Sequence, residues 1–374
     1  MLFKRHFLRE YFINIWNGKR KTHPVRILLR LVSLLYLFAI QGRSCFYKTG
    51  ILKVKKLPCP VISVGNLTLG GTGKTPVVAY IARFFSDKGL NPVVLSRGYG
   101  RSVRTPIAIV SDGKNILLNP EEAGDEPYLL AENHPSLPIL VGKNRYQSGI
   151  KAIKEFNPDV LILDDGFQHL SLARDLDIVL INNSKPVVND HIFPSGPFRE
   201  PVSALQRSDV VLYTHSDEST GDGFENISVK KDGLRLKASH DFENISRMKD
   251  KKIKLPEELN KKKIAIFCGI GEPGSFRKRI EQYGGEVVYF ETYPDHYVYN
   301  AEDIEFIRQR ARKLKAELIL TTQKDEVKIK WIAPAVPFIW VVRLKIGFVE
   351  GEQKFQEALL ASVLQKNNNN KVKI

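Results

Sequence analysis

The 374-residue sequence has few cysteines and almost no acidic residues near its N-terminus. Cys45, Cys59 and Cys268 are too few and too scattered for a disulfide framework or a zinc site, which favours a reducing cytosol. No internal repeat of fixed period is present. The length is typical of two domains.

The charge is concentrated at the N-terminus. Thirteen Lys or Arg precede residue 57 and Glu10 is the only acid among them, so this segment carries +12 of the formal net charge of +16. Such one-sided charge favours a polyanionic partner, either nucleic acid or an anionic lipid surface. The apolar run at residues 27–40 contains Arg30 and is shorter than the roughly 20 residues of a spanning helix.

The same run has two sides in a helical projection. Polar residues share one side and large apolar residues share the other: Arg26, Arg30 and Ser33 against Leu28, Leu31, Leu35 and Phe38. This pattern predicts an amphipathic, membrane-associated helix within residues 1–56, whose apolar run and few stacking aromatics argue against nucleic acid. A signal peptide would need a small-residue cleavage site, which is missing. A helix packed in the protein core remains an alternative.

Short β-branched runs alternate with helical stretches between residues 57 and 216, which predicts a wound parallel sheet buried on both faces. The expected strands are 61–64, 93–95, 160–163, 178–181 and 210–213. Residues 217–262 are polar and predict a linker. A smaller α/β domain is expected at 263–365, with strands 264–268, 287–290, 318–321 and 338–342 and helices 275–283, 301–315 and 355–364. Residues 366–374 predict a polar tail that buries nothing.

Residues 61–76 combine an apolar strand, a glycine-rich turn and a helix start, the context of a Walker phosphate loop. Backbone N–H groups of such a turn bind phosphate oxygens. Lys74 is expected to reach the β- and γ-phosphates of ATP, and the Thr75 hydroxyl to hold Mg²⁺. Thr68 stands where the general pattern has glycine, and a glycine-rich turn without nucleotide is the alternative. The predicted nucleotide-binding residues are Thr68, Leu69, Gly70, Gly71, Thr72, Gly73, Lys74 and Thr75.

Two acids, Asp164 and Asp165, follow the apolar strand expected at 160–163. In wound sheets this end of the strands faces the ligand, so both are candidate Mg²⁺ ligands with Thr75. A simple turn at Asp-Asp-Gly is the alternative. At Asp125, which begins another expected helix, spacing alone favours an N-cap.

Arginines lie in glycine- or proline-marked loops at Arg97, Arg101 and Arg199, where phosphate binding and plain solvation are equally plausible. Residues 269–274 match G-x-G-x-x-G after an expected strand. A dinucleotide site there would make the protein an oxidoreductase, but Pro273 and the phosphate loop elsewhere disfavour it.

Several unusual motifs follow one another along the chain, at residues 64–68 with 70–76, 96–100, 124–127, 164–169 and 196–200. Together they resemble the tetraacyldisaccharide 4'-kinases of lipid A biosynthesis, and the resemblance covers nearly the whole chain. Thr68 looks normal for this family. The resemblance implies transfer of the γ-phosphate of ATP, with Mg²⁺, to the 4'-hydroxyl of a tetraacyldisaccharide 1-phosphate. It places this activity at the cytoplasmic face of the inner membrane.

The resemblance also implies site residues. Asp125 would be the catalytic base, and residues 293–297 look similar to the segment whose histidine, here His296, pairs with that base. Lys74 would be the third catalytic residue, and Arg97, Gln168 and Arg199 the candidates for binding substrate or phosphate. A lipid substrate and a membrane surface are the expected partners, with no nucleic acid and no protein partner. A membrane-associated switch ATPase and a nucleic-acid-binding module are the rival classes.

Overall fold

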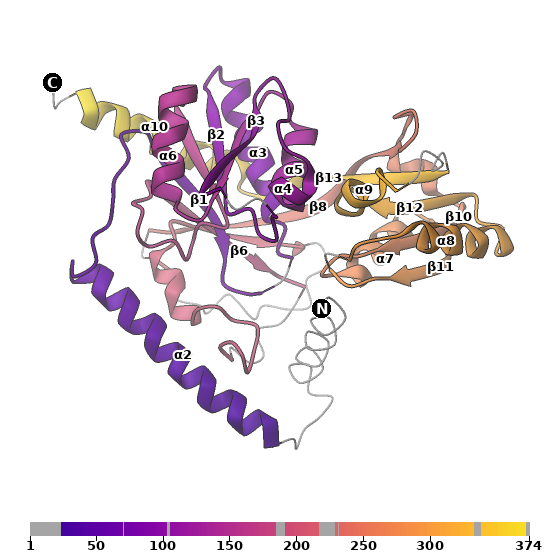
Figure 1. The fold of residues 1–374 in the computed structure, drawn as a ribbon, viewed down its shortest axis with the longest axis horizontal. Coiled ribbons are helices and arrows are strands. Elements are labelled where there is room, and N and C mark those ends of the chain that lie inside the picture. Colours follow the sequence, from indigo (N-terminus) through magenta and orange to yellow (C-terminus); the bar gives the residue numbers. More distant parts are fainter. Residues whose placement is uncertain are drawn as a thin grey trace. The chain divides into compact units, whose positions relative to one another are not determined.

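The computed structural model describes residues 24–69, 71–102, 105–184, 191–216, 229–230, 232–295, 297–332 and 338–371. The fold is α/β with a mixed, mostly parallel sheet (Figure 1). Contacts within the chain define two units. Unit 1 contains residues 1–97, 144–239 and 348–374, and unit 2 contains residues 98–143 and 240–347.

Unit 1 is built on parallel strands in the order β8, β7, β6, β1, β5, β2. They span Val61–Asn66 (β1), Pro92–Ser96 (β2), Val160–Asp164 (β5), Leu176–Asn182 (β6), Val210–Thr214 (β7) and Leu234–Arg247 (β8). Every residue of β1, β2, β5 and β7 is buried, as expected for strands covered on both faces. The five strands predicted for this region are confirmed. Its helices are α2 (Pro24–Lys48), α3 (Lys74–Asp87), α6 (Arg145–Phe156), η1 (Val202–Arg207) and α10 (Glu352–Lys371).

Unit 2 combines two segments of the chain. Its C-terminal part has parallel strands in the order β11, β10, β12, β13. These are β10 (Lys263–Cys268), β11 (Glu286–Thr292), β12 (Leu318–Thr322) and β13 (Ile339–Glu350), with α7 (Pro273–Gln282), α8 (Ala301–Lys313), α9 (Gln323–Ile329), β9 (Ile253–Lys254) and η3 (Pro256–Leu259). The four predicted strands and helices α7 and α8 are confirmed. The segment 98–143 adds an antiparallel pair, β3 (Ile107–Asp112) and β4 (Pro138–Gly142), and helices α4 (Pro120–Ala123) and α5 (Asp125–Asn133).

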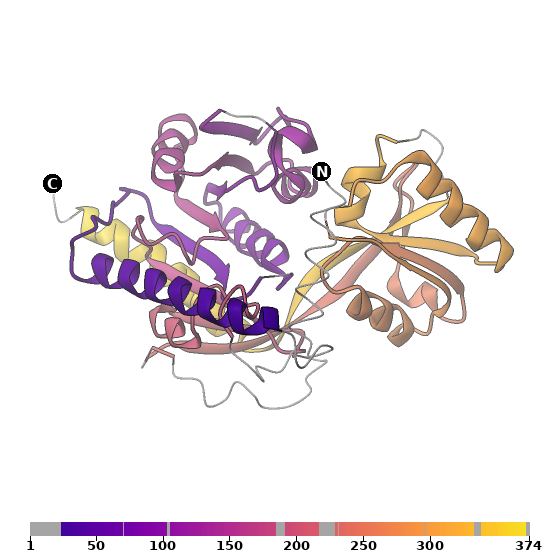
Figure 2. The ribbon, with the colours of Figure 1, turned by 60° about the horizontal axis from the view of Figure 1, so that its bottom comes forward.

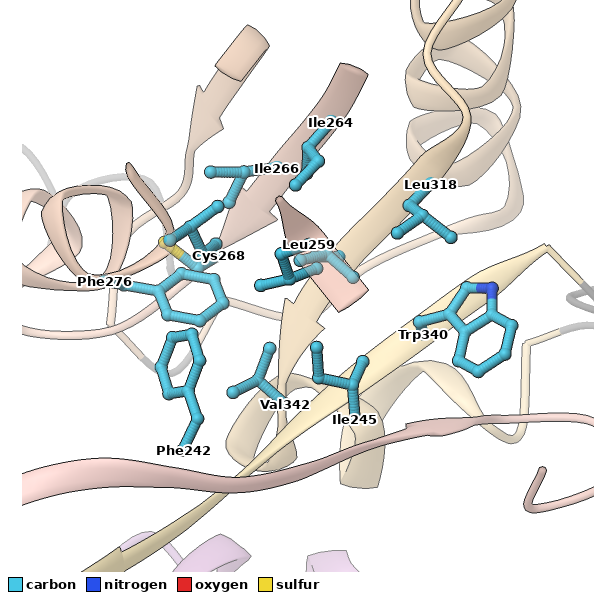
Figure 3. Packing of buried hydrophobic residues seen from close by; sticks show 12 residues of the cluster. Phe242, Ile245, Leu259, Ile264, Ile266, Cys268, Phe276, Leu318, Trp340 and Val342 are labelled. Carbon is cyan, nitrogen blue, oxygen red and sulfur yellow. The ribbon is translucent and has the colours of Figure 1, made fainter. Parts of the chain in front are cut away.

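One face of the C-terminal strands is covered by a continuous apolar cluster. Figure 3 shows the Phe242 and Phe276 rings meeting beside Cys268, with Val342 and Ile245 filling the space next to them. Trp340 is 7% exposed and has the cations of Arg247 and Lys254 each 5.5 Å from its ring centroid. Burial of these side chains gives this α/β segment an apolar core of its own.

Two segments differ from the sequence expectation. The predicted linker, 217–262, contains strand β8, in which Leu236, Ala238, His240 and Phe242 are buried while their neighbours are not. A half-buried strand is polar at every second position, so its composition resembles that of a linker. The predicted tail, 366–374, is helical as far as Lys371, and Lys366 Nζ lies 2.8 Å from Asp175.

Helix α2 is longer than the apolar run at 27–40 from which a helix was predicted. It is the long straight helix of Figure 2. Most of its large apolar side chains are exposed, among them Leu35 and Phe38 at 71% each, so it is not a core helix. By length and composition alone, residues 25–48 could also cross a membrane, a property shared with N-terminal signal sequences. The apolar run at 27–40 alone is too short to span a membrane, but the complete helix is long enough.

The other side of α2 packs against residues 192–195. Ser33, expected with the arginines on the polar side, is 6% exposed; its hydroxyl lies 2.9 Å from the Ile192 carbonyl and accepts a hydrogen bond from the Ser195 N–H at 2.9 Å. The ring of Tyr36 packs edge-on against Phe193. The protein therefore holds this helix at its middle.

A tight approach near the end of β1 gives the first prediction. A Cβ at Gly65 would lie 2.5 Å from Phe167 Cβ and 2.8 Å from its backbone nitrogen. Gly65→Ala should therefore lower the free energy of unfolding by about 1–3 kcal/mol, measured by chemical unfolding followed by circular dichroism. Gly42→Ala on α2, whose Cβ would meet nothing within 4 Å, is the control. Equal stability of the two variants would contradict this packing.

Candidate phosphate-binding and catalytic site

The glycine-rich turn lies between β1 and α3. Gly73, in the left-handed conformation, precedes Lys74, the first residue of α3. The Thr72 hydroxyl accepts a hydrogen bond from the Asn66 amide at 2.9 Å, and the Thr72 carbonyl accepts one from the Thr214 hydroxyl at 3.2 Å. The turn is thus held at the ends of β1 and β7. Gly70 lies outside the described residues.

The first half of the turn pairs with residues 197–199. Leu69 donates its N–H to the Pro197 carbonyl at 2.8 Å, and Arg199 donates its N–H to the Leu67 carbonyl at 2.7 Å. A bridge between Thr68 and Phe198 lies between these two bonds. The backbone pairing therefore brings Arg199 next to the turn, although the two are far apart in sequence.

The acid pair lies at the carboxyl end of β5, which is the neighbour of β1 in the sheet: Asp164 is the last residue of β5 and Asp165 follows it. Asp165 has a left-handed backbone, φ 54°, and its carboxylate lies 3.4 Å from Lys74 Nζ and 2.9 Å from Arg199 Nη1. Burial favours a higher pKa for Asp165, but the two cations outweigh it and lower the pKa to about 2. The carboxylate is therefore ionised at neutral pH.

Asp164 faces a different environment. It is 5% exposed, its carboxylate accepts a hydrogen bond from the Ser96 hydroxyl at 2.9 Å, and its carbonyl accepts one from Arg145 Nη2 at 3.3 Å. Burial lowers the pKa of Arg145 to about 10, opposed by the charges of Asp164 and Asp165. Arg145 thus adds a buried cation beside the acid pair.

The predicted metal ligands have suitable chemistry for Mg²⁺. Mg²⁺ prefers hard oxygen ligands and is usually held by one or two carboxylates together with substrate phosphates. Thr75, at the start of α3, offers a hydroxyl, and Asp164 and Asp165 offer carboxylates. Within the described ranges no cluster of three or more His, Cys, Asp or Glu side chains that could hold a metal occurs.

The other predicted binding residues lie in the same unit. The Gln168 amide donates to the Asn66 carbonyl at 2.9 Å, and the Gln168 carbonyl accepts a hydrogen bond from Arg43 of α2. Gln168 therefore braces the end of β1. The charge of Arg97 contributes to the low pKa values of Arg145 and His169, which places it near the acid pair.

Sequence reasoning missed two neighbours of the acids. Burial, followed by the charges of Arg145, Arg174, Arg43 and Arg97, lowers the pKa of His169 to about 4, so its imidazole is neutral at pH 7. Arg145 is the first residue of α6, capped by Asn144. The sequence signal for Arg145 was its position directly after an Asn cap that follows the apolar strand β4. Neither β4 nor α6 was predicted, so this signal was not used.

Asp125 belongs to unit 2. Gly124 is the N-cap of α5 and Asp125 is its first helical residue, so the N-cap interpretation of Asp125 is wrong. Lys328 Nζ of α9 lies 3.8 Å from its carboxylate. His296, its expected partner, lies outside the described residues, and the neighbouring Asp295 pairs with Lys324 at 3.0 Å.

The G-x-G-x-x-G segment has a packing explanation. Gly269 donates its N–H to the Asp325 carboxylate at 3.0 Å, and a Cβ there would lie 2.9 Å from the Pro294 carbonyl and 3.1 Å from the Tyr299 hydroxyl. Close approach of these groups therefore requires glycine without any dinucleotide.

Comparison with known proteins identifies the family of the chain. The family model described as LpxK, tetraacyldisaccharide-1-P 4'-kinase, matches residues 25–364. The chain belongs to this family. It is a tetraacyldisaccharide 4'-kinase of lipid A biosynthesis, as the motifs predicted.

Relatives match over most of their length. The tetraacyldisaccharide 4'-kinase of Syntrophus aciditrophicus is 42% identical over 337 residues, covering 86% of this chain and 90% of that protein. The enzyme of the same description from Pelobacter propionicus is 38% identical, with 86% and 89% covered. A crystal structure of LpxK from Aquifex aeolicus in complex with ATP is 33% identical and has a TM-score of 0.74, covering 91% of this chain and 99% of that one.

The ion cluster around Asp165 gives the second prediction. Removing the guanidinium with Arg199→Met should lower kcat/KM for ATP by about 100-fold, since one cation that faces the acid pair and can stabilise phosphate charge is lost. Steady-state kinetics at fixed Mg²⁺ measure this. The control is Arg83→Met, which breaks an exposed ion pair with Asp87 on the surface of α3. A kcat/KM for ATP in Arg199→Met equal to that of the wild type would show that Arg199 takes no part in the site.

Proposed function

We propose that this kinase transfers the γ-phosphate of ATP to the 4'-hydroxyl of a tetraacyldisaccharide 1-phosphate, using the phosphate loop at 68–75. The observation that carries this proposal is the 3.4 Å approach of Lys74 to Asp165, which joins the helix start after the turn to the acid pair after the neighbouring strand. A Walker loop needs both parts to bind a nucleotide with its metal.

Each part of the loop has a role in the proposal. Backbone N–H groups of residues 68–75 bind phosphate oxygens, and Lys74 binds the β- and γ-phosphates. Thr75, Asp164 and Asp165 would hold Mg²⁺, which when bound neutralises charge on the transferring phosphoryl group. The pairing of residues 67–69 with 197–199 supports this assignment because it holds the turn in one shape.

Cationic and amide side chains complete the phosphate site. Arg199 and Arg97 neutralise negative charge as the phosphoryl group moves between oxygens. Gln168 braces the end of β1, so its contribution to substrate binding is indirect. Arg145 joins this group because it is buried beside Asp164.

Proton removal is assigned to Asp125. The sugar hydroxyl forms a bond to the γ-phosphorus while the bond to the β-phosphate oxygen breaks, and its proton passes to the Asp125 carboxylate. Gly124 takes the capping position of α5, which leaves the Asp125 carboxylate outside the capping role. His296 is the proposed orienting partner of Asp125, by family resemblance.

The lipid acceptor explains helix α2. We assign the helix to the interfacial region of the cytoplasmic face of the inner membrane, where its exposed apolar side can contact acyl chains and its cations anionic head groups. The hydrogen bonds between Ser33 and residues 192–195 support a helix that lies on the membrane surface. If the helix spanned the membrane, this contact with the rest of the protein would lie inside the bilayer.

Transfer of label tests the proposed function. The wild-type enzyme, incubated with γ-labelled ATP, Mg²⁺ and detergent-dispersed tetraacyldisaccharide 1-phosphate, should label the lipid. Lys74→Ala and Asp125→Ala should each lower kcat by at least about 100-fold with the fold retained. Hydrolysis of ATP by the wild type without labelled lipid would favour the rival switch ATPase.

The proposed membrane contact predicts a charge effect. Reversing Arg26 and Arg30 to Glu should weaken binding to vesicles containing anionic lipid by about tenfold or more, because each basic residue near such a surface contributes about 1 kcal/mol. Co-sedimentation at low and raised salt measures this, and Arg83→Glu on α3 is the control. Unchanged binding of the double variant would contradict the interfacial assignment of α2.

A further inference from the structure

Helix α9 packs on α5 within unit 2 through a row of cations. Lys324 Nζ lies 3.3 Å from the Glu126 carboxylate, and Lys330 Nζ lies 2.7 Å from that of Glu132. These two lysine side chains are each 19% exposed, and each ammonium also has a second hydrogen-bond partner. Each of these two ammonium groups is thus satisfied by hydrogen bonds, which need no role in chemistry to explain them.

Lys328 of α9, between these two lysines in sequence, differs from both. Its side chain is only 8% exposed, and among the described residues its ammonium makes no hydrogen bond. The Asp125 carboxylate lies 3.8 Å away, and burial lowers the pKa of Lys328 while Asp325 and Asp125 oppose that effect. A buried ammonium without a hydrogen bond is costly, so a structural role alone does not explain it.

The other charges that face Lys328 are engaged elsewhere. The Asp325 carboxylate accepts hydrogen bonds from the Tyr299 hydroxyl at 2.9 Å, the Thr322 hydroxyl at 2.6 Å and the Gly269 N–H at 3.0 Å. Asp295 accepts a hydrogen bond from Lys324, whose own positive charge disfavours the protonated form of Lys328. Asp125, whose carboxylate lies 3.8 Å from Lys328 Nζ, is the carboxylate proposed to change its charge state during turnover.

We propose that Lys328 is a positioning residue for the base, holding the Asp125 carboxylate ionised and oriented until it takes the proton of the sugar 4'-hydroxyl. This inference rests on the proposed role of Asp125. When Asp125 accepts the proton, the buried ammonium loses one of the negative charges that face it. The ion pair therefore favours return of that proton to solvent after the phosphorylated lipid leaves.

The pH profile of kcat/KM for the lipid acceptor tests this role. In Lys328→Met the acid limb should move to higher pH by about one unit, because a carboxylate without its neighbouring cation protonates at higher pH. At pH 7, kcat should fall about tenfold or more while KM for ATP stays within twofold. Lys328→Arg, which keeps the charge, should restore the acid limb, and Lys330→Met is the matched control on the same helix seam.

The outcomes separate this inference from the function on which it rests. Full activity of Asp125→Asn would remove Asp125 as the base. An inactive Asp125→Asn enzyme with an unmoved acid limb in Lys328→Met would overturn only the role of Lys328. If Lys328→Met does not fold, Lys328→Gln replaces it with the same measurement. Loss of the fold in both variants would assign Lys328 a purely structural role and overturn the proposal.

Discussion

The parallel pairing of β1 with β5 places Val64 opposite Asp164, and the proposed phosphate site depends on that register. Both strands are buried along their full length, so a slip by one residue would move each side chain to the opposite face, among different packed neighbours. The close approach of Gly65 to Phe167 then packs the turn after β5 directly on β1. In this register Lys74 Nζ lies 3.4 Å from the Asp165 carboxylate.

Helix α2 is connected to the glycine-rich turn by hydrogen bonds. Arg43 of α2 donates to the Gln168 carbonyl, the Gln168 amide donates to the Asn66 carbonyl, and the Asn66 amide donates to Thr72 in the turn. Each of these bonds lies within unit 1. The surface that exposes apolar side chains and the glycine-rich turn are therefore parts of one packed body.

The expected domains at 1–56, 57–216, 217–262 and 263–365 follow the order of the sequence, whereas the contacts do not. The chain passes between the units near residues 97, 143, 239 and 347, and residues 98–143 are grouped with the C-terminal segment. Ion pairs between α5 and α9 are one physical reason. Asp125 and its expected partner His296 belong to different expected domains, 57–216 and 263–365, yet residue 125 and the segment around 296 fall in the same unit.

Local chemistry in the sequence was sufficient to predict the turn at 65–75, the acids after β5, the buried strands and an N-terminal helix with an apolar side. These features depend on glycine, on β-branched runs and on helical periodicity, which act over short stretches of chain. Folding decided that Arg145 and Ser96 contact Asp164, that Ser33 is buried and that Lys328 faces Asp125. Such contacts join residues far apart in sequence, and only packing of the complete chain determines which buried charges become neighbours.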